Sequence, residues 1–318
     1  MAIIYDPRMT FQANEAFNRA RRRALWQGVL GLLKGRPAIR ANLLSFDTVR
    51  DKLKIRGQHY AGLQTIPLDK IVGSVGRYQE FDRAFLPAQE HIRKRWRAVY
   101  QAAQGMGVPP IDVYKIGDAY FVRDGHHRVS VLKELGAIDV EAYVTEFETL
   151  VPVPADTVEA DLDLKGEYAA FLFETGLDRL RLEQQIEFTV PGQYRKLEEH
   201  IAVHRYFVGQ RESREVPDDE AVARWYDEVY CPLAEIIREA EILEQFPGRT
   251  EADLYLWLIE HQRYVSEEAG YDVSLEEAAA DFSAEFSQGP GRKELEAAVK
   301  RAKADSRVDR SMIGGEDD

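Results

Sequence analysis

The stretch AYFVRDGHHRVSVLKELG, residues 119–136, joins two apolar patterns across a short polar cluster. Residues 119–122 are apolar and aromatic, which is typical of a strand, whereas residues 129–135 repeat apolar side chains at helical spacing until Gly136 ends the pattern. The polar residues 124–128, DGHHR, are therefore predicted to lie at a strand-to-helix turn. The first N–H groups of a helix have no partners within it and lie at the positive end of its dipole, so such a turn suits phosphate or carboxylate.

Two residues of this turn favour a bound anion. Gly125 has no side chain, so the backbone can approach a ligand closely. Arg128 can direct two donors onto one anion. Capping of the helix without a ligand is the alternative interpretation, and the cluster of charged and imidazole side chains favours a binding site over it.

The composition indicates a folded chain of about two domains, because 318 residues include 45% hydrophobic and 31% charged residues. Cys231 is the single cysteine, which excludes an intrachain disulfide framework. No stretch is long and apolar enough for a signal peptide or a membrane span. We therefore expect a cytoplasmic protein with no membrane partner.

Charge is distributed unevenly along the chain. Residues 1–60 carry 12 Lys and Arg against four acids, a net +8, whereas the whole chain carries −13 and the remainder −21. The run RRR at 21–23 is able to contact nucleic acid, but the acidic remainder would repel DNA. The favoured interpretation is an amphipathic helix that docks on the protein and exposes or ion-pairs its arginines. Its apolar residues are Phe17, Leu25, Trp26, Val29, Leu32 and Leu33.

The pattern of elements predicts an α+β protein in four segments. These are a basic helical leader (1–60), an α/β domain (61–150), an α-helical domain (151–306) and a flexible tail (307–318). The leader is expected to hold helices at 10–34 and 46–54. In the α/β domain we expect a strand that runs into a turn at 64–71, a polar loop at 73–87 and a helix at 88–104. Strands at 111–116 and 119–122 are predicted to form a hairpin with its turn at Gly117 and Asp118, and a last strand is predicted at 138–144. Helices are predicted beyond residue 157, at 177–188, 193–208, 217–244, 250–268, 274–287 and 291–305.

Residues 64–147 resemble the ParB and sulfiredoxin superfamily. The motifs that carry this resemblance are IPLDKI at 66–71 and IDVYKIGDAYFVRDGHHRVSVLKELG at 111–136. The leader and the C-terminal half, with FPGRTEADLYLW at 246–257, look like an uncharacterised bacterial family. The resemblance implies a ParB/sulfiredoxin-like α/β domain that binds a nucleotide or phosphate.

The turn distinguishes the branches of that superfamily. Chromosome-partition ParB proteins bind the CTP triphosphate with a Gly-Glu-Arg-Arg type of motif, of which Gly125 and Arg128 keep the first and last residues. Sulfiredoxins carry a redox cysteine where this chain has His126, and Cys231 lies far away in the sequence. Free serine kinases of the superfamily use Asp-Gly-His-x-Arg, which residues 124–128 match at every defined position. The turn is therefore most similar to the kinase branch.

The resemblance and the chemistry of phosphoryl transfer together suggest a role for each side chain. Phosphate binding is assigned to Gly125, His126, His127, Arg128 and Arg77. Asp124 is expected to hold Mg²⁺ or to contact the acceptor. Glu80 is the expected catalytic base, with Asp82 as the alternative and a solvated loop acid as the structural interpretation of Glu80. The predicted catalytic residues are Glu80, Asp124 and His126.

Three functions follow as hypotheses. The first is a Mg²⁺-dependent phosphotransferase or nucleotide hydrolase that uses ATP, ADP or CTP and acts on a small hydroxyl-bearing molecule or on water. The second is a nucleotide-switched, DNA-associated regulator of ParB type, for which the basic leader is the supporting feature. The third is a non-catalytic ligand sensor or an assembly factor whose helical domain binds another protein. A homodimer is compatible with each of them, and the oligomeric state is left open.

His200 and His204 stand one helical turn apart, a spacing that can chelate a metal. No third ligand can be identified from the sequence. Core or surface histidines are therefore the favoured interpretation.

Overall fold

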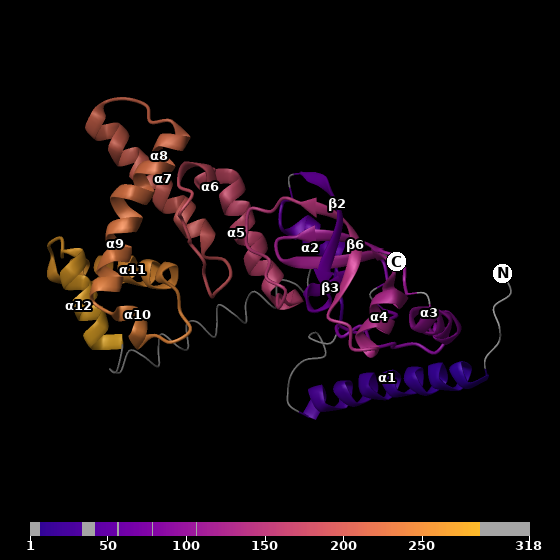
Figure 1. Ribbon diagram of the computed structural model, residues 1–318. Coiled ribbons are helices and arrows are strands. Elements are labelled where there is room, and N and C mark those ends of the chain that lie inside the picture. Colours follow the sequence, from indigo (N-terminus) through magenta and orange to yellow (C-terminus); the bar gives the residue numbers. More distant parts are fainter. Residues whose placement is uncertain (1–6, 34–41, 56, 78, 106, 287–318) are drawn as a thin grey trace, which may run out of the picture. The chain divides into compact units, whose positions relative to one another are not determined.

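The computed structural model describes residues 7–33, 42–55, 57–77, 79–105 and 107–286. The chain divides into two compact units, Met1–Lys165 and Gly166–Asp318 (Figure 1). All the strands of the described residues lie in the first unit, and the second is helical. The predicted α+β class with a helical C-terminal region is thus confirmed.

The first unit alternates helices with strands. Its helices are α1 (Pro7–Leu33), α2 (Phe46–Lys52), α3 (Arg93–Gly105), α4 (His126–Glu134) and the short 3₁₀ turns η2 (Leu68–Lys70) and η3 (Glu159–Asp161). Its strands are β1 (Leu44–Ser45), β2 (Gln58–Pro67), β3 (Ile71–Ser74), β4 (Ile111–Ile116), β5 (Ala119–Asp124) and β6 (Asp139–Phe147). Helix α5 (Leu162–Thr175) crosses the boundary between the units.

The six strands form one mixed sheet in the order β1-β3-β5-β4-β6-β2. β4 and β5 form the predicted antiparallel hairpin, with Tyr114 opposite Phe121. β3 lies parallel to β5, and β6 lies parallel to β4, so the loop after β3 and the turn after β5 both leave the same end of the sheet. That end is where the polar turn was predicted to lie.

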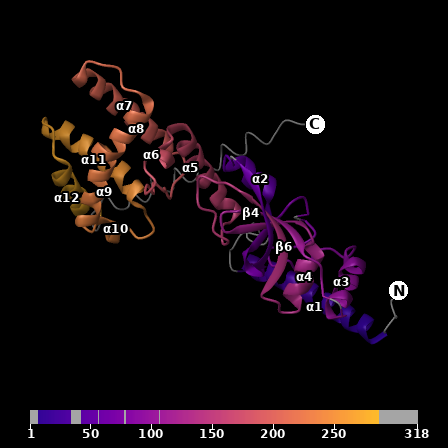
Figure 2. The ribbon, with the colours of Figure 1, turned by 45° about the horizontal axis from the view of Figure 1, so that its top comes forward.

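One face of the sheet is covered by α1, α3 and α4, which lie together in both views (Figure 2). Phe17 of α1 meets Trp96 of α3 edge to face, with ring centroids 5.5 Å apart, and both side chains are fully buried. Strand residues such as Ile111 and Val122 join the same apolar core. Burial of these large side chains stabilises the first unit and fixes the start of α4 against the sheet.

The other face of the sheet carries an aromatic cluster beneath α2. The ring of Phe46 lies 4.7 Å from that of Tyr114, 5.7 Å from that of Phe121 and 5.0 Å from that of Phe147. Ser45 caps α2 by accepting a hydrogen bond from the Thr48 N–H. This short helix is therefore held by both its cap and its aromatic side chain.

The second unit is built around the buried helix α11. Its helices are α6 (Leu177–Leu180), α7 (Tyr194–Glu212), α8 (Asp218–Trp225), a π-helical turn η4 (Tyr226–Tyr230), α9 (Cys231–Glu239), α10 (Ile242–Gln245), α11 (Glu251–Ala269) and α12 (Leu275–Phe286). Tyr255 of α11 is fully buried and contacts the rings of Trp225 and Tyr230. No helix in the described ranges is both long enough and apolar enough to span a membrane.

The structure confirms one predicted element near the start of the sheet and corrects another in the second unit. The strand predicted to run into a turn at 64–71 is the end of β2, which stops at Pro67 and is followed by η2; the chain then continues as β3, at a different position in the sheet. The helix predicted at 177–188 is helical only over Leu177–Leu180. Beyond it the backbone of Ile186 is held by two tyrosine hydroxyls, those of Tyr168 and Tyr194, which replace helical hydrogen bonds.

Other predicted boundaries differ less. The segment 217–244 is divided by η4 and by Glu241, whose φ of 52° ends α9. Helix α3 begins at Arg93, five residues later than predicted. The predicted helix at 291–305 and the tail at 307–318 lie outside the described residues.

Candidate functional site

The polar turn lies between β5, which ends at Asp124, and α4, which begins at His126. Gly125 joins them with φ of 105°, a left-handed conformation that a residue with a side chain rarely adopts. A Cβ at this position would lie 2.5 Å from Cγ2 of Ile111 and 3.0 Å from Nε of Arg128. Both the backbone conformation and the close packing therefore require glycine.

The start of α4 has no cap from the protein. Gly125 offers no side-chain cap, and the first backbone hydrogen bond of the helix runs from Val129 N–H to the Gly125 carbonyl, 3.0 Å. Within the described ranges, no acceptor pairs with the N–H groups of His126, His127 and Arg128. Because His126 and His127 are 3% and 6% exposed, these donors lie at a largely buried helix start, where a ligand can satisfy them.

His126 is held by Ser74, which sequence reasoning missed. Ser74 Oγ lies 2.6 Å from His126 Nε2 and accepts a hydrogen bond from the Arg77 N–H at 3.1 Å. The Ser74 hydroxyl either donates to Nε2 or accepts from it, according to the tautomer of His126. Burial, together with the nearby charges of Arg77 and His127, lowers the pKa of His126 to about 4. The imidazole is therefore neutral at pH 7 and links β3 to the turn.

His127 lies in a buried and positively charged environment. Burial lowers its pKa to about 4, and the charges of Arg95, Arg77 and His91 act in the same direction, whereas Glu80 raises the pKa. Its ring meets that of Phe81 edge to face at 5.4 Å. Its Nδ1 is buried and has no hydrogen-bond partner in the described part of the chain. The cations gathered here, like the helix dipole, favour an anion.

The loop after β3 brings two predicted residues to the turn. Arg77 Nη1 donates to Glu80 Oε2 at 3.3 Å, and His91 Nε2 lies 3.9 Å from Glu80 Oε1. The backbone of Arg77 is tied through Ser74 to His126, so Arg77 and Glu80 belong to the same site as the turn.

Asp82, the alternative base, has a different role in its loop. Its Oδ1 accepts hydrogen bonds from the N–H groups of Ala84, at 3.0 Å, and Leu86, at 2.8 Å. Burial raises its pKa. These bonds hold the loop turn in which Phe85 adopts a positive φ of 59°. The carboxylate of Asp82 therefore stabilises the loop.

Arg128 and Asp124 form an ion pair within the turn. Arg128 Nη1 also donates to the carbonyls of Pro109, at 3.1 Å, and Pro110. The side chain of Asp124 is 60% exposed, whereas that of Arg128 is 18% exposed. The guanidinium thus anchors the loop before β4 to the start of α4, and its Nε–H lies beside Gly125.

Metal ligands are sparse in the described part of the chain, where no group of three His, Cys, Asp or Glu side chains is able to hold an ion. His200 Nδ1 lies 3.1 Å from the Tyr255 hydroxyl, and His204 Nε2 lies 3.4 Å from Glu228. These two histidines therefore make separate contacts in the second unit.

The arginines of the leader are largely ion-paired, as the docked-helix interpretation expected. Arg19 and Arg23 contact Glu134, whose side chain is 3% exposed, and Arg21 contacts Glu90. Of the predicted apolar face, Phe17 is buried, but Trp26 is 65% exposed. The side chains of Leu25, Val29, Leu32 and Leu33 lie outside the described set.

Known proteins are similar to parts of this chain. The family model described as a domain of unknown function (DUF4032) matches residues 192–286, which include α7 to α12. A crystal structure of sulfiredoxin from Arabidopsis thaliana is 18% identical over 27% of this chain and 86% of that chain, with a TM-score of 0.22. No curated protein matches the chain. The chemistry of the site therefore rests on the geometry of its own residues.

Proposed function

We propose that the turn at the start of α4 binds the phosphate groups of a nucleotide, ATP, ADP or CTP, together with Mg²⁺. One observation carries this proposal: the N–H groups at a largely buried helix start have no cap within the described residues. A phosphate would accept hydrogen bonds from them and lie at the positive end of the helix dipole.

The surrounding side chains supply the charge that such a ligand needs. Arg95 of α3 and Arg77 of the loop after β3 both lower the pKa of His127 through their charges. Arg128 keeps its Nε–H for the ligand while its Nη groups hold Asp124 and the proline carbonyls. Asp124 is exposed enough to contact Mg²⁺ that is held mainly by the phosphates, which is how proteins commonly bind this ion.

Glu80 is the proposed base of a phosphotransferase or nucleotide hydrolase. Its carboxylate accepts a hydrogen bond from Arg77 Nη1 at 3.3 Å. Because a phosphate would compete for that guanidinium, binding would release Glu80 to accept a proton from a hydroxyl-bearing acceptor or from water. His126 has its Nε2 engaged by Ser74 and is neutral, so we propose it as a positioning residue that holds the loop of Arg77 against α4.

The test combines binding with turnover on the same preparations. Thermal shift with ATP, ADP, CTP and GTP, each with and without Mg²⁺, identifies the ligand, since a ligand at 100 times its Kd stabilises by about 2.7 kcal/mol. Turnover is then measured with hydroxylated metabolites, serine included. Glu80→Gln should keep nucleotide binding but lower turnover roughly 10²-fold, and Asp124→Asn should weaken both only when Mg²⁺ is present.

Asp118→Asn is the matched control, because Asp118 lies at the opposite end of β5 and pairs with Lys70. It should leave binding and turnover unchanged. If the protein binds nucleotide without turnover and Glu80→Gln behaves as wild type, the catalytic part of the proposal is wrong and the site is that of a non-catalytic sensor. If no nucleotide changes the melting temperature, the proposal that the site binds a nucleotide is wrong.

A further inference from the structure

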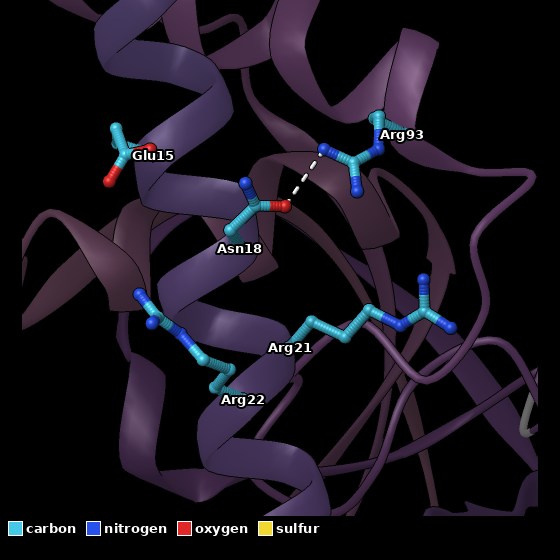
Figure 3. A pocket seen from close by; sticks show the side chains of 5 residues that line it. All are labelled: Glu15, Asn18, Arg21, Arg22 and Arg93. Carbon is cyan, nitrogen blue, oxygen red and sulfur yellow. Dashed lines mark hydrogen bonds between the residues drawn. The ribbon is translucent and has the colours of Figure 1, made fainter.

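A second cationic site lies between α1 and α3, away from the turn of α4. A pocket of about 390 Å³ is lined there by Glu15, Asn18, Arg21, Arg22 and Arg93. Figure 3 shows the first four side chains on α1 and Arg93 approaching from α3. Guanidinium groups from two helices therefore border one depression.

Arg93 is fixed in place by its neighbours. Its Nη1 donates to Asn18 Oδ1 at 2.9 Å, its Nε contacts Glu90, and its guanidinium carbon lies 4.5 Å from the centre of the Phe17 ring. Its Nη2 group is left without a partner among these contacts. Because Asn18 uses its oxygen on Arg93, its amide NH₂ group remains as a further donor.

The arginines of α1 divide into two groups. Arg19 and Arg23 are both used by the buried Glu134 and hold α1 against α4. Arg21 and Arg93 share the single carboxylate of Glu90, so together they keep an excess positive charge. Arg22 has no ion-pair partner among the described residues, and docking of α1 does not use it.

We propose that this pocket binds a small anion with a diphosphate group. The pocket is lined by three arginines and an asparagine from two helices, and donors spread around its wall suit a tetrahedral oxyanion, whose oxygens point in several directions, better than a planar carboxylate. A volume of about 390 Å³ lies near the lower end of ligand pockets and has room for two phosphates. Glu15 also lines the pocket, and its carboxylate would accept a hydrogen bond from a hydroxyl or amine of the ligand.

The site is tested by titrating the full-length protein with pyrophosphate at low ionic strength. Trp26 lies one helical turn beyond Arg22 and its ring is exposed, so its fluorescence reports on a ligand at this place. Arg22→Ala should weaken pyrophosphate binding about tenfold, and Arg22→Glu should weaken it further. The signal should be missing in Trp26→Phe while calorimetry still detects binding there. Added salt should weaken the binding.

Two controls separate this site from others. Lys94→Ala removes an equal charge from the exposed side of α3 next to Arg93 and should leave the affinity unchanged. Arg77→Ala alters only the α4 site, so pyrophosphate binding at Arg22 should survive it even if the proposed nucleotide site is wrong.

The proposal is wrong if pyrophosphate does not bind up to millimolar concentration, if wild type and Arg22→Ala have equal affinity, or if Arg22→Ala and Lys94→Ala lose equal affinity. Binding of an oligonucleotide without binding of pyrophosphate would also overturn it, and would assign the arginines to a nucleic-acid backbone instead. Circular dichroism of each variant confirms that a lost signal is not a lost fold.

Discussion

The first N–H groups of α4 and α11 differ in whether the protein itself caps them. At α11, Thr250 Oγ1 accepts a hydrogen bond from the Asp253 N–H at 3.3 Å, and Asp253 Oδ2 accepts one from the Thr250 N–H at 3.2 Å. Asp253 also accepts two hydrogen bonds from Thr189, one from its hydroxyl at 2.6 Å and one from its backbone N–H at 3.1 Å. At α4 the equivalent position is Gly125, which has no side chain to offer.

This difference separates stability from binding. The start of α11 is complete without a ligand, and a buried carboxylate neutralises the dipole at that end. The start of α4 keeps its donors and its positive potential available. Changes at α11 should therefore affect folding alone, whereas changes at α4 should also affect the binding of an anion.

The largest expected effect is at α11. Asp253→Ala removes the acceptor of three hydrogen bonds from Thr189 and Thr250. It should lower the free energy of unfolding by at least about 4.5 kcal/mol, since each hydrogen bond to a charged group contributes about 1.5–3 kcal/mol. Calorimetry measures the loss. Asp219→Ala, an exposed acid in the first turn of α8, is the control and should change it little. Phosphate binding should be unaffected, and a parallel loss of affinity would break the comparison.

Gly125→Ala should cost somewhat less in stability but also remove binding. The φ of 105° and the 2.5 Å approach to Ile111 together predict a loss of about 3 kcal/mol. Any shift of α4 that relieves the clash also displaces its N–H groups. Urea unfolding and nucleotide titration on the same variant measure both effects. Gly136→Ala, at a positive φ with open space around its Cβ, serves as control for the backbone strain alone.

Arg128→Ala sharpens the comparison within the α4 site. The substitution removes a charged protein group that would donate to the ligand, and it leaves the carboxylate of Asp124 unpaired beside the phosphates. The Kd for nucleotide should rise roughly 10- to 100-fold. Calorimetric titration gives this ratio. Unchanged affinity in a folded variant would restrict Arg128 to anchoring the loop of Pro109 and Pro110.

The last prediction concerns the dependence of stability on pH. The pKa values of His126 and His127 are lowered to about 4 in the folded protein. Between pH 6.5 and 4 the unfolded chain therefore binds more protons at these sites, and their contribution to stability is lost as the pH falls through that window. His127→Phe should reduce this proton uptake by about one, as measured by unfolding at several pH values. An unchanged pH dependence would mean that His127 titrates normally.

Local patterns predicted the parts of the site that are close in sequence. The hairpin of β4 and β5, the turn and the helix after it follow from the apolar runs on either side of DGHHR and from the turn residues Gly117 and Asp118. The position of Arg77 and Glu80 near the turn came from resemblance, since no spacing reveals it.

The contact of Ser74 with His126 and the hydrogen bonds of Arg128 could not be predicted from the sequence, for a physical reason. Ser74 lies 52 residues before His126, and only the parallel pairing of β3 with β5 brings them together. Arg128 carries a side chain suited to phosphate, but the acceptors that occupy it are backbone carbonyls, which every residue has. The helix predicted at 177–188 failed similarly, because tyrosine hydroxyls from elsewhere bind its backbone.

The position of β2 at the edge of the sheet has a consequence for hydrogen–deuterium exchange. β2 pairs only with β6 within the described chain, and antiparallel pairing bonds every second amide of a strand to a given neighbour. Along Gln58–Pro67, amides directed toward β6 should exchange slowly and those between them quickly. The bulge between Tyr60 and Gly62 should shift this alternation of slow and fast exchange by one residue. The exchange rates along β2 would therefore locate the irregularity in the strand.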